Sequence, residues 1–383
     1  MKILCVVDGW FPSAGGSEKQ AILIAENMRD RGHSVEYLSP QLDANAAKLE
    51  DLNGIPCKRL GFLRVPGLAS ATYCLNAARF LVQHGHRYDV IHIHMVAKFA
   101  MVLACIKPFV RATVLAKVAG ATEFDNGVFD TRLNGIISRV LRQLTLRIGV
   151  FQAISRQTVA RLDALGLPRE RMLVLPNAID LSRFTPSRAL HAEADTAPTV
   201  LAFTGRLVEE KSLPVLIAAI ALLKTRTDTP FELRLAGDGP LRSELELLVA
   251  THGLEKDVTF YGEIDNVDAF LAAAHVYCQV SRIEGLSNSV LEAMASGLPC
   301  VLTRISGNED LLVDGENGLG VEVGDAEGLA DQLATLVEDR ALCRRMGLAA
   351  RSHVEGAFGV ERVTAAIERC YRGETVFQAV GAQ

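Results

Sequence analysis

Short apolar runs alternate with amphipathic stretches along the first half of the chain. Residues 3–7 form a continuous apolar run, which is typical of a strand buried on both faces of a parallel sheet. An amphipathic stretch over 17–31 follows and ends at Gly32, which predicts a helix. The same rhythm predicts further strands at 35–39, 55–60, 88–93, 112–118, 149–154 and 172–176. This alternation of strand and helix predicts an α/β fold with a doubly wound parallel sheet.

The rhythm is interrupted at residues 179–198 and then begins again. The interruption contains prolines and a polar run at 192–196, so we predict a linker between two domains. Strands of a second α/β unit are predicted at 199–203, 231–236, 257–261, 275–280 and 299–303. Its helices are predicted at 213–224, 241–252, 266–273, 326–337 and 339–355. We therefore predict one Rossmann-like domain over 1–178 and a second one over 199–357.

The end of the chain predicts one more helix, at about 360–372. Its apolar positions Val363, Ala366, Ile367 and Cys370 follow helical spacing and need a surface to cover. We therefore expect this helix to pack its apolar face on one of the two domains.

Composition and charge narrow the class of protein. The chain has 383 residues, 49% hydrophobic and 22% charged, which fits a globular protein of two α/β domains. Its net charge of −5 gives no sign of nucleic-acid binding. The eight cysteines include no C-x-x-C pair, so we expect free thiols rather than disulfides or zinc ligands. Residues 2–7 are too short for a secretory signal, and charged residues interrupt the apolar stretch 97–120, so we expect a cytoplasmic protein without a membrane span.

The segment 282–301 carries the strongest candidate chemistry. Glu284 and Glu292 are eight positions apart, and an apolar strand-like run lies on each side of the segment. Ser287, Asn288 or Ser289 can cap a short helix that carries Glu292. The free backbone N–H groups at the start of such a helix bind anions. Paired carboxylates beside an anion site suit a ligand with phosphates and many hydroxyls, such as a nucleotide sugar.

This segment resembles the E-x7-E signature of family 4 retaining glycosyltransferases, which have the two-domain GT-B fold. The resemblance implies two Rossmann-like domains facing across a cleft. It also implies that Glu284 contacts sugar hydroxyls, that Glu292 contacts the ribose, and that Gly285, Leu286 and Ser289 help to bind the donor. Without the resemblance, Glu292 also fits a capping box with Ser289, and Glu284 also fits a solvated loop.

Further motifs occur in the order that this family shows. Residues 204–212 resemble its G-R-L-x-x-x-K-G motif, which implies that Arg206 and Lys211 hold the donor diphosphate. Ser212 stands where glycine is common, and we expect it to cap the following helix. Residues 237–240 resemble a G-x-G-P turn near the nucleotide, and residues 306–310 resemble a glycine-rich loop near the sugar or phosphate. Alone, the first is also a common turn. Residues 358–361 resemble the family's short break before its last helix, which implies that the C-terminal segment 358–383 crosses back and packs on the first domain.

The first domain offers weaker candidates. Gly16 lies in a Gly-Gly loop after the first strand, where the resemblance implies a contact with the donor phosphates. Many family members carry a histidine after the strand predicted here at 112–118, but this chain has none at that position. His94 is the alternative catalytic candidate, although a histidine at a strand end is more often structural. Glu123 and Asp125 are candidates for the acceptor side.

The stretch 132–147 is basic and amphipathic. It contains Arg132, Arg139, Arg142 and Arg147, and its apolar residues share one helical face. Such a helix either packs its apolar face on its own domain or makes a peripheral contact with an anionic membrane. The second interpretation would place the enzyme at the inner face of a membrane.

These features together predict a retaining glycosyltransferase. It would move a sugar from a nucleotide diphosphate donor to a hydroxyl of a glycan or a lipid-linked acceptor, in cell-surface glycan or polysaccharide synthesis. We expect no cofactor and no metal, because the chain shows no cluster with ligand spacing. A nucleotide-sugar epimerase or a phosphorylase on the same scaffold remains an alternative. A nicotinamide oxidoreductase is disfavoured because no G-x-G-x-x-G fingerprint follows a strand.

Overall fold

The computed structural model describes residues 1–13, 15–43, 45, 47–125, 127–186 and 197–374. The chain divides into two compact units, Met1–Ala178 with Val360–Gln383, and Ile179–Gly359. Each unit is built around its own sheet. Residues 187–196 of the predicted linker lie outside the described residues. Its beginning belongs to the second unit, where Ile179 forms a β-bridge with Gly359 and Phe184 is buried.

The first unit contains an eight-stranded sheet in the order β3-β4-β2-β1-β5-β6-β7-β8. Its strands are β1 (Lys2–Val6), β2 (Ser34–Pro40), β3 (Leu49–Leu52), β4 (Ile55–Leu60), β5 (Val90–Ile93), β6 (Thr113–Val118), β7 (Val150–Ala153) and β8 (Met172–Val174). Its helices are α1 (Gly16–Asp30), α2 (Ala69–His84), α3 (Lys98–Ile106), α4 (Ala121–Phe124), α5 (Ile136–Thr145), α6 (Arg156–Ala164) and α13 (Val360–Tyr371). All neighbouring strands are parallel except β3 and β4.

The central strand β1 is covered on both faces. Ile3 and Cys5 pack in the hydrophobic cluster that contains α1 and α13. Leu4 and Val6 pack in the other cluster, with α2 and α3. Because successive side chains of a strand point to opposite faces, a strand covered by helices on both sides must be apolar throughout. The continuous apolar run at residues 3–7 is explained in this way.

The C-terminal helix α13 packs on the first unit, as predicted. Val363 and Ile367 are buried in the cluster that contains α1. The carboxylate of Glu368 accepts a hydrogen bond of 2.9 Å from Arg31 and contacts His33 at 3.2 Å. The apolar spacing predicted that this helix needs a surface to cover, and the family resemblance implied that the surface lies on the first domain.

The second unit contains a six-stranded parallel sheet in the order β11-β10-β9-β12-β13-β14. Its strands are β9 (Thr199–Thr204), β10 (Phe231–Ala236), β11 (Val258–Gly262), β12 (Val276–Gln279), β13 (Cys300–Thr303) and β14 (Gly318–Val321). Its helices are α7 (Leu213–Arg226), α8 (Arg242–Thr251), α9 (Val267–Ala272), α10 (Asn288–Ala295), α11 (Ala326–Glu338) and α12 (Arg340–Ala357).

Two strands were missing from the sequence prediction. Strand β3 has the sequence LEDL and carries two acidic residues, and β14 has the sequence GLGV and carries two glycines. Acidic residues and glycine have low strand propensity, so neither segment has a typical strand composition. Both lie at the edges of their sheets, where pairing with one neighbouring strand decides the conformation.

Candidate active site

The site in the second unit begins with the loop after β9. Gly205 has a φ of 153°, and its N–H donates a 2.9 Å hydrogen bond to the carbonyl of Ala236. A Cβ atom at Gly237 would lie only 1.9 Å from the carbonyl oxygen of Gly205. A Cβ atom at Gly239 would lie 2.5 Å from the carbonyl oxygen of Leu207. The G-x-G-P turn therefore lets two loops pack backbone to backbone, while its contact with a nucleotide stays a prediction.

The loop presents two basic side chains. Arg206 is exposed, and Lys211 ends a short 3₁₀ helix, Glu209–Lys211. Ser212 follows in the left-handed region, with φ 49° and ψ 37°.

The expectation that Ser212 caps α7 is wrong. Its hydroxyl is buried and makes no hydrogen bond to any described residue, although it occupies the N-cap position. A capping side chain needs the extended backbone of a normal N-cap, whereas the left-handed region favours glycine. This conformation gives a physical reason for the glycine that is common here in the family.

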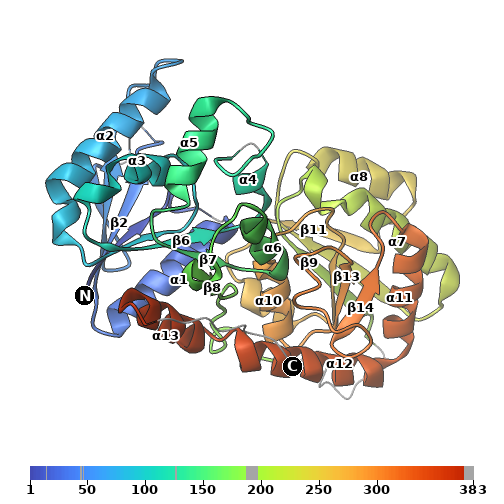
Figure 1. Cartoon of the computed structure of the whole chain (residues 1–383). Helices are drawn as coiled ribbons and strands as arrows, with labels where there is room; N and C mark the ends of the chain where they lie inside the picture. The colour runs from blue at the N-terminus through green and yellow to red at the C-terminus, as the bar shows by residue number, and fades with distance from the viewer. Residues whose placement is uncertain (14, 44, 46, 126, 187–196, 375–383) are drawn as a thin grey trace. The chain divides into compact units, whose positions relative to one another are not determined.

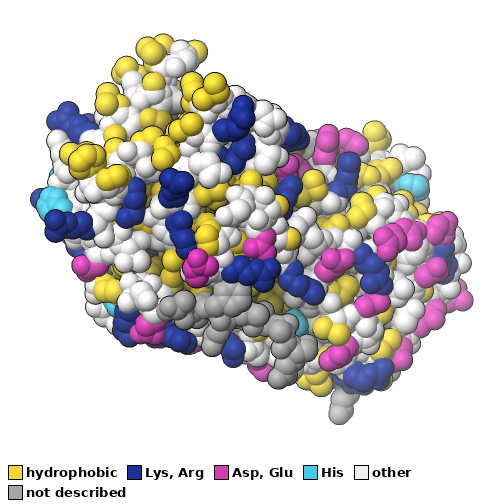
Figure 2. All heavy atoms as spheres, in the orientation of Figure 1, with side chains coloured by type: hydrophobic (Ala, Val, Ile, Leu, Met, Phe, Trp, Pro, Cys, Tyr) yellow, Lys and Arg dark blue, Asp and Glu magenta, His cyan; other side chains and the backbone are white. Residues whose placement is uncertain are grey.

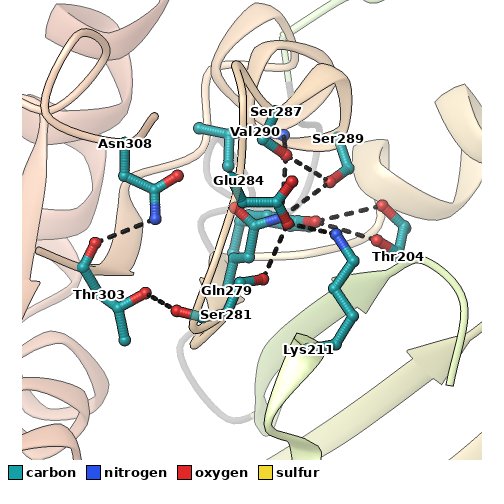
Figure 3. A network of polar contacts seen from close by, with 11 residues as sticks. Thr204, Lys211, Gln279, Ser281, Glu284, Ser287, Ser289, Val290, Thr303 and Asn308 are labelled. Atoms are coloured by element: carbon teal, nitrogen blue, oxygen red, sulfur yellow. Dashed lines mark hydrogen bonds and ion pairs between the residues drawn. The ribbon is translucent and has the colours of Figure 1, made fainter. Parts of the chain in front are cut away.

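Glu284 is the centre of a polar network (Figure 3). Its Oε1 atom contacts the ammonium of Lys211 and accepts hydrogen bonds of 2.9 Å from the hydroxyl of Ser281 and 3.3 Å from the amide of Gln279. The side chains of Lys211 and Glu284 are only 18% and 15% exposed. The structure therefore rejects the solvated-loop alternative for Glu284 and brings the predicted sugar and phosphate groups together.

Sequence reasoning missed Gln279, the last residue of β12. Its side chain is fully buried, and its amide nitrogen donates a hydrogen bond of 2.8 Å to Ser287 and one of 3.3 Å to Ser289. Gln279 thus connects Glu284 to the first turn of α10 (Figure 3). The sequence signal was the amide side chain at the end of the otherwise apolar strand VYCQ. A buried polar side chain normally forms hydrogen bonds, so this position deserved a partner.

The cap of α10 rejects the other alternative, the capping box at Glu292. Ser287 is the N-cap, and its hydroxyl accepts from the N–H of Val290 at 3.4 Å. A capping box places its carboxylate three residues after the cap. Glu292 lies five residues after Ser287 and is partly exposed. Burial raises the pKa of the Tyr277 phenol, and the nearby charge of Glu292 adds to this shift. Its contact with a ribose stays a prediction.

The loop after β13 packs against the carboxylate loop. A Cβ atom at Gly307 would lie 2.4 Å from the carbonyl oxygen of Gly285 and 2.7 Å from that of Glu284. The hydroxyl of Thr303 donates to the carbonyl of Ser281 at 2.6 Å. Leu286, the other predicted donor-binding residue of this loop, is buried. The glycine-rich loop is therefore a backbone support for Glu284.

In the first unit, the candidate loop at Gly16 leads directly into a helix. Gly16 is the first residue of α1, and Gly15 is its cap, with φ −62° and no side-chain bond. Neither glycine has a positive φ, and the start of α1 is the place where an anion would meet backbone N–H groups. The contact of Gly16 with phosphates stays a prediction.

His94 does not reach the surface of the first unit. It is 1% exposed, stacks on His92 at 4.0 Å between ring centroids, and neither ring nitrogen has a partner among the described residues. Burial, with help from His92 and Lys117, holds the pKa of His94 well below its usual value, so the imidazole is neutral. His92 contacts the hydroxyl of Tyr371 in α13 at 2.7 Å. The stacked pair of His92 and His94 fits a structural role, and the catalytic assignment of His94 stays a prediction.

The two acidic candidates also have structural partners. The Glu123 carboxylate accepts hydrogen bonds from the N–H groups of Ala119, at 2.8 Å, and Gly120, at 3.1 Å, which holds the loop after β6. Burial raises the pKa of Glu123, and these backbone bonds oppose the shift. Asp125 contacts Arg132 at 3.6 Å and Arg161 at 3.5 Å. Their acceptor-side assignment stays a prediction.

Sequence reasoning also missed Lys117, in β6. Its side chain is buried, and desolvation lowers its pKa to about 7, against the opposing effect of Glu123. A lysine inside the strand TVLAKV was the signal that could have identified it.

The basic stretch 132–147 contains helix α5. Two of its four arginines are engaged by other groups of the first unit. Arg142 is buried and donates to backbone carbonyls, including that of Leu133 at 3.1 Å. Arg132 is held by Asp130 at 2.8 Å. Arg139 and Arg147 are exposed. The expectation of four arginines for membrane contact is therefore corrected to these two.

The described residues contain no group of three or more His, Cys, Asp or Glu side chains that could hold a metal ion. No helix among them is both long enough and apolar enough to span a membrane.

Comparisons with known proteins agree with this fold. Residues 15–178 match the model of a "Glycosyl transferase 4-like domain", and residues 190–353 match "Glycosyl transferases group 1". The solved structure of Anabaena HepE in complex with UDP has a TM-score of 0.78 at 22% identity, covering 97% of this chain and 100% of that chain. Two Rossmann-like units with these neighbours define the GT-B class of glycosyltransferases.

The chain belongs to the group 1, family 4-type glycosyltransferases. It is 26% identical over 372 residues to N-acetyl-alpha-D-glucosaminyl L-malate synthase of Bacillus anthracis, with 94% of each chain covered. It is 28% identical over 393 residues to the GDP-mannose-dependent alpha-(1-6)-phosphatidylinositol monomannoside mannosyltransferase of Mycobacterium tuberculosis, covering 97% of this chain and 98% of that one.

Proposed function

We propose that this glycosyltransferase takes its sugar from a nucleotide diphosphate sugar and transfers it with retention of the anomeric configuration. One observation carries the proposal: Lys211 and Glu284 meet at the strand ends of the second unit, beside the start of α10. A cation for the diphosphate and a carboxylate for the sugar hydroxyls are the two groups that such a donor needs.

The basic groups act on the leaving group. In the reaction the bond between the anomeric carbon and the diphosphate oxygen breaks, and the acceptor oxygen bonds to that carbon on the same face. The acceptor proton passes to the departing diphosphate. Negative charge on the diphosphate is greatest in the transition state, so Arg206, Lys211 and the N–H groups at the start of α10 stabilise that state more than the bound donor.

Glu284 has a positioning role before and during transfer. Gln279 and Ser281 hold its Oε1 atom, which fixes the direction of the carboxylate. Oε2 has no partner among the described residues and is available to a sugar hydroxyl. Donor phosphates compete with Glu284 for Lys211, so donor binding weakens one ion pair as it forms another.

The acceptor is proposed to be a glycan or a lipid-linked acceptor in cell-surface glycan synthesis. The relatives include an N-acetyl-alpha-D-glucosaminyl L-malate synthase and a phosphatidylinositol monomannoside mannosyltransferase, so enzymes similar to this chain are named for both a small molecule and a lipid. We favour the lipid-linked class, reached by peripheral contact with an anionic membrane, because α5 exposes Ile136, Ile137 and Arg139 together.

The test begins with nucleotide release from a panel of UDP-, GDP- and ADP-sugars. Slow release from one donor without an acceptor is expected. A phosphorylase would instead require inorganic phosphate, and an epimerase would convert the sugar without releasing nucleotide. Absence of release from every donor, with and without acceptors, contradicts the proposal.

A variant then tests the donor assignment of Glu292. Glu292→Ala should weaken donor binding by about 10- to 150-fold, which is the loss of a charged hydrogen bond of about 1.5–3 kcal/mol. Glu338→Ala, at the exposed end of α11, is the matched control and should leave donor affinity unchanged. A lowered melting temperature with an unchanged dissociation constant would give Glu292 a structural role only.

A further inference from the structure

Three segments of the first unit are rich in basic residues. Residues 61–88, 94–120 and 131–149 contain three, four and four Lys or Arg and no Asp or Glu. They include α2, α3 and α5, and α3 packs against both α2 and α5 (Figure 1). Lys117 and Arg142 are buried, and Arg132 pairs with Asp125 and Asp130. The other exposed basic residues of these segments are Arg64, Arg79, Arg87, Lys98, Arg111, Arg139 and Arg147. Since the whole chain has a net charge of −5, this local excess of positive charge is specific to the region.

The same region exposes large hydrophobic side chains. Leu68, Leu75 and Val82 lie seven residues apart along the outer face of α2 and are at least 50% exposed. On α5, Ile136 and Ile137 are each 76% exposed. Figure 2 shows hydrophobic side chains over α2 and α5, with Lys and Arg among them. Exposed apolar side chains in a basic surrounding are typical of contact with an anionic lipid surface.

A pocket opens between α3 and α5. Its volume is about 390 Å³, and most of its lining is apolar, including Met95, Met101, Val128 and Leu141. Exposed Lys98 also lines it. The two carboxylates of the lining are already engaged: backbone N–H groups bind one and two arginines neutralise the other.

We propose that this pocket receives a hydrocarbon chain of an anionic lipid acceptor while the α2–α5 surface contacts the membrane. The proposal rests on the proposed glycosyltransferase function and specifies its acceptor class. Lys98 lies where it can neutralise an anionic headgroup next to the buried chain. A peptide would bring backbone N–H and C=O groups into a pocket with few bonding partners, so a hydrocarbon chain fits the lining better.

Binding of a hydrocarbon chain in the pocket can be measured on the wild-type protein alone. The probe is a series of lysophosphatidylglycerols of increasing chain length, titrated calorimetrically below their micelle concentrations. We expect saturable binding of one molecule, with affinity rising about fourfold for each added methylene until the pocket is full. Lysophosphatidylcholine of the same chain length should bind more weakly, and salt should reduce that difference.

Two variants locate the binding. Ser138→Trp fills the pocket, and Leu133→Asp places a carboxylate in its lining. Each should weaken lysophosphatidylglycerol binding at least tenfold. Gln143→Trp, the matched control, carries the same bulky group at an exposed position of α5 outside the pocket. Binding that is absent in the wild type, or equal in both pocket variants and the control, overturns the proposal.

Nucleotide release from the donor panel, measured on the same wild-type preparation, separates this inference from the proposed function. Donor turnover without binding of the lysolipid would contradict the pocket assignment alone. Binding of the lysolipid without turnover of any donor would contradict the proposed function and leave a lipid-binding pocket.

Discussion

The ammonium of Lys211 contacts Oε1 of Glu284 across 73 positions of the chain. Both side chains are mostly withdrawn from water, so the pair is more than a surface ion pair. Removing either partner leaves the other charge partly buried and unpaired. In the proposed reaction Glu284 orients the sugar and Lys211 binds the departing diphosphate, so this ion pair connects the two roles.

Lys211→Ala and Arg206→Ala should each lower kcat by about 100-fold or more, because both charges are aimed at the departing diphosphate. Lys224→Ala is the control, since its ammonium pairs with Asp257 at 2.6 Å on the surface. The measurement is steady-state turnover with the identified donor. Wild-type turnover in both variants would remove the phosphate-clamp assignment.

Gln279→Leu should lower kcat about tenfold with a smaller change in KM. The substitution keeps the volume but removes the amide that holds Glu284 and the first turn of α10. Tenfold corresponds to about 1.4 kcal/mol of transition-state stabilisation. Unfolding in urea is measured in parallel; a loss of stability with unchanged kcat would show that Gln279 supports the fold only.

Gly307→Ala should impair donor turnover, because its Cβ would overlap the carbonyl oxygens of Glu284 and Gly285 and force their loop to move. Gly356→Ala is the control: a Cβ there meets nothing within 4 Å, and the residue lies inside helix α12. The control should be stabilised by about 0.4–1 kcal/mol with normal activity. Equal activities of the two variants would contradict the support role of Gly307.

Lys117→Met should stabilise the protein most near pH 6 and least near pH 10. In the folded state the pKa of Lys117 is about 7, below its ordinary value of 10.5, so the unfolded state binds more protons between these values. The cost of burying this lysine is therefore complete below pH 7 and disappears as pH rises to about 10.5. His92 and His94 next to it have lowered pKa values and stay neutral in this range. Urea unfolding of both proteins at pH 6 and pH 9.5 checks this, and a pH-independent difference would refute it.

Transfer should proceed without a divalent metal, since Lys211, Arg206 and the start of α10 are proposed to stabilise the diphosphate charge. The measurement is donor turnover after exhaustive treatment with a chelator. Complete loss of turnover that magnesium or manganese restores would show that a metal carries part of this charge.

The sequence by itself determined most of the strands and helices and their division into two α/β units. Continuous apolar runs such as residues 3–7 predict strands covered on both faces, and the spacing of Val363 and Ile367 predicted a docked C-terminal helix. Glu284, Glu292 and Lys211 were found as candidates because their short motifs resemble those of family 4 glycosyltransferases. Local sequence carries this information because hydrophobic periodicity and capping depend on neighbouring residues.

Only the tertiary structure decided how those candidates are used. The order β9-β12-β13 places Lys211, Gln279 and Gly307 beside Glu284, and no local pattern encodes that proximity. The same packing buries His94 and Arg142, which looked available in the sequence, and leaves Ile136 and Ile137 exposed. The physical reason is that burial and hydrogen bonding between distant segments depend on which strands become neighbours, and the crossover connections set this only when the whole sheet has formed.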